Sequence, residues 1–424
     1  MSQVLSLLCM GRLELRITGL RASTIQLDGW RFPIVRVDTD EGIYGLGEAR
    51  DGSDKRQLLE LKPLIVGEDP RNVEHLFQKI RSRGGRGALG RHGGGVSGVE
   101  MALWDIAGKA AGLPVHRLIG GKRRERVRVY VDSGGGVLSD GSRSARYPNK
   151  GWEEAFTPEA YAEQARRSKA LGFTIVKFDL GYHGLFLSIP GYALGQHTSE
   201  RGFKAQVACV RAVKEILGDE VELCLDLGSE DYLASSKHMS LESAVTLCKA
   251  LEPFNLLWAE DALSDAHLDS WVALTNSTTV PTLTGEDLYL RYDFLPFLQN
   301  HAIDVAHPDI ATAGGILEGK KIGDLSELFG VSVAQHCAGS PVSMMANVHC
   351  AAAQPDNFIA MEFHAADLPG WESLVEGLPR PLIKNGFIDV TEKPGLGIEL
   401  NEDAVRRHLA VGETYFEESP NSAR

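Results

Sequence analysis

The sequence predicts an α/β protein in which a barrel of parallel strands follows an α+β domain. From residue 127 onward, short apolar runs rich in β-branched residues recur at a regular interval, and helical patterns separate most of them. Residues 13 to 125 lack this repeat and mix strand and helix patterns. Alternating strands and helices are typical of parallel βαβ units, and many such units in one stretch favour a closed barrel over an open sheet.

The barrel strands are expected at eight apolar runs. Between them, Thr157 followed by Pro158 is typical of a helix start, and so is Ser240 at the head of a later helical stretch. No clear helix follows the eighth run, so we expect the last unit to lack its helix. In chain order the runs are Val127–Val131, Thr174–Lys177, Val221–Leu225, Leu256–Ala259, Pro281–Thr284, Ile303–Ala306, Val331–Ala334 and Phe358–Met361.

These patterns divide the chain into three segments. Residues 1–125 form the N-terminal α+β domain, with a strand pattern at Phe32–Val37 and a helical one at Val99–Ala111. Residues 126–375 form the barrel. Residues 376–424 contain short, turn-rich strand patterns, and we expect this segment to return to the N-terminal domain.

Composition argues against several kinds of partner. The formal net charge is −13, whereas nucleic-acid binding generally depends on clustered Lys and Arg that neutralise phosphates. No apolar stretch approaches the length needed to span a membrane. The 6 cysteines form no CxxC pair or dense cluster, which is typical of free thiols in a reducing compartment. We therefore expect a cytoplasmic protein that binds neither nucleic acid nor membrane.

A titratable residue ends each of the eight runs. The carboxyl ends of parallel barrel strands lie at one face, where active sites are built, so these side chains should converge. A single Asp after a strand is often only a helix N-cap, but this explanation is weak for a complete set. The residues are Asp132, Asp179, Asp226, Glu260, Glu286, Asp309, His336 and Glu362.

Three of these residues, from successive strands, suit a metal ion. Asp226, Glu260 and Glu286 offer only oxygen donors, as a hard cation such as Mg²⁺ prefers. Without a cation, three clustered carboxylates would not all stay ionised. Lys177 in the same barrel mouth would bring their summed charge with one dication to zero. We expect one Mg²⁺ per subunit, placed to stabilise the enediolate that forms when a proton leaves the carbon beside a substrate carboxylate.

Acid/base groups are expected among the remaining strand ends. Asp309 and His336 end neighbouring strands, so the carboxylate could orient the imidazole and favour its protonated form. Lys177 and Asp179 are two residues apart and so face the same way, where either could assist. Glu362 is expected among other carboxylates, where crowding would let it donate a hydrogen bond as a neutral acid.

Three further motifs lie outside the strand ends: GIYGLGE at Gly42–Glu48, GVEMALWD at Gly98–Asp105 and PGLG at Pro394–Gly397. Together with the strand-end residues, they resemble the mandelate racemase group of the enolase superfamily across nearly the whole chain. The resemblance implies a (β/α)7β barrel, a modified TIM barrel, with an α+β capping domain. It also implies that the three carboxylates proposed above bind the metal.

The resemblance further implies that Asp309 and His336 form a catalytic dyad, that Glu362 hydrogen-bonds the substrate carboxylate, and that Lys177 is the first lysine of a Lys-x-Lys motif. Asp179 stands where that motif has its second lysine. A racemase needs acid/base groups on both faces of the carbon, whereas a dehydratase can work with one histidine. We therefore favour dehydration of an acid sugar, an aldonate or aldarate, to a 2-keto-3-deoxy acid.

Other functions stay open. Asp179 could be the second base of a racemase or epimerase, and a cycloisomerase could use the same intermediate. A metal-dependent hydrolase is disfavoured, because it would require a His-x-His pair at the end of the first strand, where the chain has Val131, Asp132 and Ser133. A non-catalytic barrel that only binds a ligand would be expected to have lost at least one of the metal carboxylates.

Substrate contacts are expected from loops that cover the barrel mouth. By the resemblance, the capping-domain loops would supply Trp30 and Arg50. His183 lies in the long connection formed by residues 181–203, and His364 lies two residues beyond Glu362. The resemblance also suggests a symmetric homo-oligomer that acts on a small carboxylate.

Overall fold

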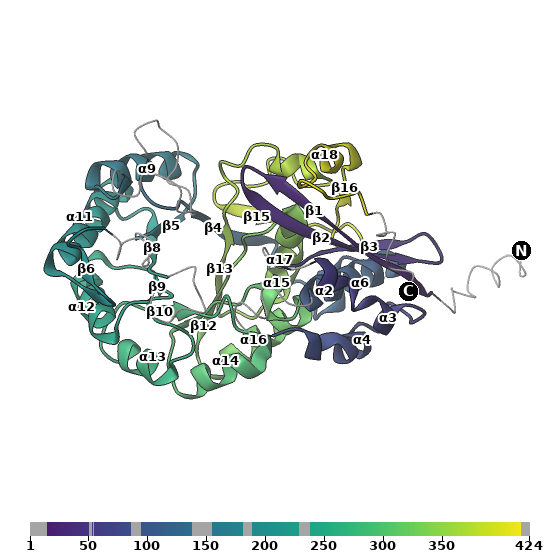
Figure 1. Cartoon of the computed structure of the whole chain (residues 1–424), viewed down its shortest axis with the longest axis horizontal. Coiled ribbons are helices and arrows are strands. Elements are labelled where there is room, and N and C mark those ends of the chain that lie inside the picture. Colours follow the sequence, from purple (N-terminus) through teal and green to yellow (C-terminus); the bar gives the residue numbers. More distant parts are fainter. Residues whose placement is uncertain are drawn as a thin grey trace, which may run out of the picture.

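A ring of strands enclosed by helices lies beside a smaller domain in this computed structural model (Figure 1). The structure describes residues 15–50, 53, 55–85, 95–137, 155–180, 189–228 and 238–416. The fold predicted from the sequence, a parallel barrel with an α+β capping domain, is confirmed.

The capping domain is built on an antiparallel sheet of β1 (Ile17–Leu27), β2 (Trp30–Thr39) and β3 (Tyr44–Glu48). The two residues that join β1 to β2, Asp28 and Gly29, both have positive φ (43° and 87°), as a tight type I′ hairpin turn requires. The helices of this domain are α2 (Lys55–Leu59), α3 (Lys62–Ile65), α4 (Val73–Ile80), the 3-10 helix η1 (Arg81–Arg83), α6 (Val96–Ala111) and α7 (Val115–Leu118).

Strand β3 packs so closely on α6 that side chains are excluded between them. A Cβ atom at Gly45 would lie 1.9 Å from the carbonyl oxygen of Ala102, and one at Gly47 would lie 1.9 Å from that of Gly98. Because both obstacles are backbone atoms, neither can move aside as a flexible side chain would. This contact explains Gly45 and Gly47 of the GIYGLGE motif.

The eight predicted barrel strands are all present and parallel. Each strand pairs with the next along the chain, and β13 pairs with β4 to close the barrel, with Met361 opposite Val129. The strands are β4 (Arg126–Asp132), β5 (Ile175–Asp179), β8 (Glu222–Asp226), β9 (Ala259–Glu260), β10 (Thr282–Thr284), β11 (Val305–Ala306), β12 (Ser332–Gln335) and β13 (Phe358–Phe363).

Helices surround the barrel strands, as Figure 1 shows. The side chains of Thr157 and Ser240 accept the backbone N–H of Ala160 and Ser243, so both predicted N-caps form. After β5, a small hairpin of β6 (Ala193–Leu194) and β7 (His197–Thr198) precedes the next helix. The barrel helices are α9 (Pro158–Ala170), α11 (Glu200–Leu217), α12 (Leu241–Leu251), η3 (Glu252–Phe254), α13 (Leu268–Thr275), α14 (Leu290–Gln299), α15 (Ile310–Ala313), α16 (Ile316–Leu328) and α17 (Pro341–Ala353).

An apolar layer fills the barrel interior upstream of the strand ends. Each strand or the residue just before it contributes one buried side chain, so the barrel is a packed core rather than a channel. The polar strand ends therefore stand on a rigid floor. The layer consists of Tyr130, Ile175, Cys224, Trp258, Leu283, Val305, Ala334 and Ala360.

The C-terminal segment lies against the capping sheet (Figure 1). The backbone N–H of Gln26 donates to the carbonyl of His408, and that of Ala410 donates to the carbonyl of Thr24. Within residues 238–416, no α-helix follows β13 before α18, as the sequence predicted. The elements of this segment are η4 (Trp371–Leu374), β14 (Val375–Glu376), β15 (Phe387–Asp389), β16 (Glu399–Leu400) and α18 (Glu402–Arg407). The domain boundaries at 125 and 375 stay predictions.

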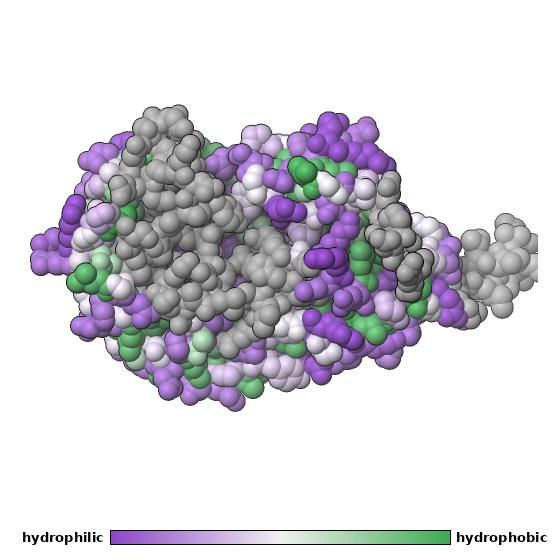
Figure 2. Space-filling model, viewed as in Figure 1, coloured by the Kyte–Doolittle hydropathy of each residue, from purple (hydrophilic) through white to green (hydrophobic). Residues whose placement is uncertain are grey.

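The described residues agree with the predictions made from the composition about membrane spans and cysteines. In the view of Figure 2, hydrophobic residues are scattered among hydrophilic ones. Among the described residues, none of the helices combines the length and the hydrophobicity that crossing a bilayer requires. The described cysteines are buried and free, as expected; they are Cys209, Cys224, Cys248, Cys337 and Cys350.

Two buried histidines meet where the capping domain contacts the barrel. His116 on α7 stacks on His349 of α17, with ring centroids 5.4 Å apart and the two Nδ1 atoms separated by 3.2 Å. Burial, together with the neighbouring His116, lowers the pKa of His349 to about 3. The folded protein therefore holds His349 neutral.

This pair predicts acid sensitivity of the fold. Between pH 6.5 and about 3, the unfolded chain binds a proton at residue 349 that the folded chain does not. Stability should then fall by up to about 1.4 kcal/mol per pH unit as the pH drops through this range. Urea unfolding measured at several pH values gives the free energy of unfolding as a function of pH. For His349→Gln this free energy should change less steeply with pH than for the wild type. The same change at His75, which is exposed, should leave the pH dependence of the free energy of unfolding as in the wild type. If His349→Gln also keeps the wild-type pH dependence, the prediction is contradicted.

Candidate active site

A buried lysine lies at the centre of the polar strand ends. Lys177 Nζ, from β5, lies 2.9 Å from Oε1 of Glu260 and 2.8 Å from Oε1 of Glu362, and 3.5 Å from Oδ2 of Asp226. Burial disfavours its charge, but the three carboxylates outweigh burial and hold the pKa of Lys177 well above its usual value. The side chains of four strands are thus brought together by one ammonium group.

Asp309 and His336 form a hydrogen-bonded pair. Their backbones adjoin in a parallel bridge, and His336 Nδ1 lies 2.5 Å from Asp309 Oδ2. The other carboxylate oxygen of Asp309 accepts the backbone N–H of Ala311 at 2.6 Å and so caps α15. Asp309 therefore has two roles: it caps α15 and it binds His336. Either role alone could explain an Asp after a strand.

The second nitrogen of His336 faces two other strand ends. Nε2 lies 2.8 Å from Oε2 of Glu286 and 3.2 Å from Oε2 of Glu362. Burial lowers the pKa of His336, but Glu286 and Glu362, with the hydrogen bond to Asp309, raise it to about 10. Because Nδ1 is engaged by the dyad, Nε2 is the nitrogen directed to the centre of the site.

Arg50, from the loop after β3, inserts into this pair from the capping domain. Its Nη1 donates to Oδ2 of Asp309 and lies 2.8 Å from His336 Nδ1, while Nη2 lies 3.4 Å from Oε1 of Glu286. Burial raises the pKa of Asp309, but Arg50 and the hydrogen bond from His336 overcome this and keep that pKa below its usual value. Arg50 thus contacts the dyad, and its predicted contact with the substrate stays a prediction.

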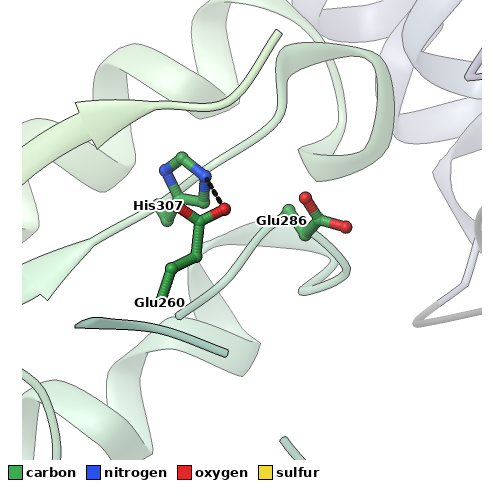
Figure 3. Close-up of side chains that lie close together, drawn as sticks. All are labelled: Glu260, Glu286 and His307. Atoms are coloured by element: carbon green, nitrogen blue, oxygen red, sulfur yellow. Dashed lines mark ion pairs between the residues drawn. The ribbon is translucent and has the colours of Figure 1, made fainter. Parts of the chain in front are cut away.

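Buried donors suited to a cation lie beside the dyad. Glu260, Glu286 and His307 each offer a ligand atom, and these atoms lie within 4.8 Å of one another (Figure 3). Asp226, the third carboxylate predicted to bind metal, ends the adjacent strand; its Oδ1 accepts the N–H of Gly228 at 2.8 Å. Two of the three predicted oxygen donors, those of Glu260 and Glu286, are thus joined by the nitrogen donor of His307, which was not predicted from the sequence.

Glu362 and Asp179, which lie at the C-terminal ends of strands β13 and β5, have different neighbours. Glu362 was expected among carboxylates, but it contacts Lys177, His336 and the backbone N–H of Cys337, at 3.2 Å from its Oε2. Its role as a neutral acid that donates a hydrogen bond to the substrate stays a prediction. Asp179 is buried and lies opposite Asp226 in the ladder of β5 and β8.

Two of the expected substrate contacts meet at the edge of the site. Trp30 of the capping sheet packs on the ring of His364 with centroids 4.6 Å apart, and His364 Nδ1 lies 3.1 Å from the carbonyl of Cys337. His183 lies outside the described residues. The loop that follows β13 is therefore joined to the capping domain through aromatic packing.

A second residue that was not predicted to lie at the site connects the capping domain to the barrel. Glu48, at the end of β3, accepts the backbone N–H groups of Ser340, at 2.9 Å, and Ser343, at 3.3 Å. Burial raises its pKa to about 7, although hydrogen bonds from Ser340 oppose the shift. Glu48 thereby holds the start of α17, which follows β12 and His336 along the chain. Its place in the GIYGLGE motif was the available signal.

A capped parallel barrel with this buried dyad and cluster of carboxylates at its strand ends defines a class of acid/base enzymes. Two family models match the chain. The model described as enolase C-terminal domain-like matches residues 160–404, and the N-terminal domain of mandelate racemase / muconate lactonizing enzyme matches residues 18–120. The chain belongs to the enolase superfamily, in its mandelate racemase group.

Relatives narrow the class of enzyme. The chain is 34% identical over 404 residues to a D-xylonate dehydratase from Haloferax volcanii, covering 93% of this chain and 90% of the relative. It is 30% identical over 395 residues to a D-galactonate dehydratase from Verminephrobacter eiseniae, covering 90% and 92%. A mandelate racemase/muconate lactonizing enzyme-like protein from Rubrobacter xylanophilus superposes with a TM-score of 0.83 at 35% identity, covering 95% of this chain and 99% of that one. This chain is an enzyme of the hydro-lyase class, a dehydratase of the superfamily.

Proposed function

We propose that the enzyme dehydrates an acid sugar, an aldonate or aldarate, to a 2-keto-3-deoxy acid. The observation that carries the proposal is the Asp309–His336 dyad, in which the second imidazole nitrogen, Nε2, contacts the buried carboxylates of Glu286 and Glu362. Two relatives support the substrate class, since they are a D-xylonate dehydratase and a D-galactonate dehydratase.

The donor set fits one divalent cation per subunit, which we propose to be Mg²⁺ held by Asp226, Glu260 and Glu286. Glu260 and Glu286 are buried and close together, as ionised carboxylates are when a cation compensates them. When bound, the cation would supply the positive charge that offsets the negative charge developing on the substrate carboxylate as the α-proton leaves.

Proton transfer is assigned to His336. Asp309 orients its ring through Nδ1, and Arg50 keeps the Asp309 carboxylate ionised. Nε2 is then the atom that donates a proton to the departing β-hydroxyl when the ring is protonated, or removes the α-proton when the ring is neutral. Lys177 remains charged and holds Glu260 and Glu362 in position. Asp179, where the family motif has a second lysine, binds a substrate hydroxyl or acts as a second base.

The first test is product analysis with a panel of acid sugars. The protein should be incubated with Mg²⁺ and individual aldonates and aldarates, beginning with D-xylonate and D-galactonate, and assayed for 2-keto acid. We expect keto product from at least one acid. If instead an acid exchanges its α-proton in D₂O without keto product, the enzyme is a racemase, epimerase or cycloisomerase. Homo-oligomeric assembly and the cytoplasmic location stay predictions.

A further inference from the structure

His307 has a single orientation fixed by the backbone. It directly follows β11 and is completely buried. Its Nδ1 lies 2.8 Å from the carbonyl oxygen of Ala334, which can only accept, so Nδ1 carries the hydrogen. In the neutral ring, the form that can bind a metal, Nε2 then presents its lone pair to the interior of the site. Figure 3 shows the ring directed at the carboxylate of Glu260.

The lone pair of His307 faces another acceptor. Nε2 lies 3.2 Å from Oε1 of Glu260, and within the described part of the chain it has no hydrogen-bond partner. Lys177 Nζ lies 2.9 Å from the same oxygen of Glu260, and a cation bound between Nε2 and Oε1 would compensate both acceptors. Glu286 contributes a third donor atom, within 4.8 Å of the other two.

The arrangement matches the geometry of metal ligands. Bonds from first-row divalent ions to nitrogen and oxygen are about 2.0–2.2 Å long, so neighbouring ligands of an octahedral ion lie about 3 Å apart. The observed 3.2 Å between Nε2 and Oε1 fits such a pair. Histidines that bind metals also typically donate their other N–H to a backbone carbonyl, as His307 does to Ala334.

We propose that Nε2 of His307 is a ligand of the active-site metal, together with Glu260 and Glu286. The inference rests on the proposed function only in assuming that this site binds a metal. A nitrogen donor favours Mn²⁺ and later first-row ions, whereas Mg²⁺ prefers oxygen donors alone. The site should therefore bind Mn²⁺ more tightly relative to Mg²⁺ than three carboxylates would.

Spin-echo spectroscopy of the Mn²⁺-loaded full-length protein tests the ligand directly. The electron spin echo envelope of bound Mn²⁺ should carry modulation from a directly coordinated histidine nitrogen, and the modulation should change to the 15N pattern in protein made with 15N-labelled histidine. His307→Gln should lose this histidine signal. His336→Gln is the matched control, because it removes the other histidine of the site and should leave the signal in place.

Calorimetry of metal binding provides the second measurement. His307→Gln should raise the Kd of Mn²⁺ by at least about tenfold, the lower end of the loss typical even for partners outside the ligand shell, and should raise that of Mg²⁺ less. Absence of histidine modulation in the wild-type protein that has bound Mn²⁺ would overturn the proposal and assign His307 to positioning Glu260. If neither ion binds, the metal site of the proposed function fails as well, whatever the dehydratase assay gives.

Discussion

Replacing His336 by asparagine should lower kcat for dehydration by about 10²- to 10⁴-fold, the range typical of a lost general acid/base. Asparagine can keep a hydrogen bond to Asp309, which lies 2.5 Å from the imidazole, but it cannot exchange a proton near neutral pH. The loss should therefore appear in kcat rather than in the affinity for the metal. Steady-state formation of 2-keto acid measures the first quantity, and calorimetric titration with Mg²⁺ measures the second.

His301→Asn is the matched control for this variant. His301 is exposed at the end of α14 and has a positive φ of 49°, a conformation that asparagine tolerates well. It should retain wild-type kcat. Turnover of His336→Asn within tenfold of the wild type would show that another group moves the proton, and Asp179 would then be the first candidate to test.

The strand-end residues could be predicted because barrel geometry determines where they meet. Parallel strands of one barrel present their carboxyl ends at one face, and residues two apart on a strand point the same way. These rules are local and repeat along the chain, so they brought Lys177, Asp309 and His336 to one site without knowledge of the packing. His307 directly follows β11 at the same face, but it was not among the residues predicted for the site.

Contacts between the domains could not be predicted in this way. Arg50 reaches Asp309 across 259 residues of sequence, and Glu48 reaches Ser340 across 292. Such contacts depend on how the whole capping sheet docks on the barrel, and no local period encodes that docking. The contact of Arg50 with the dyad could therefore not be predicted from the sequence.

Removing the charge of Lys177 should have a large effect on stability. Lys177→Met would leave Glu260 and Glu362 buried without their ammonium partner at 2.9 and 2.8 Å. Breaking a buried ion pair by removing one partner typically costs about 3–5 kcal/mol, because the remaining charge is left uncompensated in a medium that solvates it poorly. Urea unfolding of the metal-free protein near neutral pH should show a loss of this size.

Lys204→Met is the appropriate comparison, since Lys204 on α11 forms an exposed ion pair with Glu200 at 2.7 Å. Its loss should change the free energy of unfolding far less, because water already screens that pair. If Lys177→Met unfolds with nearly the same free energy as Lys204→Met, the carboxylates of the site do not depend on Lys177 for compensation.

The effects of metal and pH on the Lys177→Met variant show whether the charge or the shape of Lys177 stabilises the fold. A divalent cation bound by Glu260 would replace part of the missing positive charge and would stabilise only the folded state. Saturating Mg²⁺ should therefore narrow the stability difference between Lys177→Met and the wild type. Lowering the pH should narrow it too, since protonation of Glu260 and Glu362 removes the uncompensated charge. A difference that responds to neither would mean that methionine is tolerated or rejected for its shape, and that the charge of Lys177 is not what holds the strand ends together.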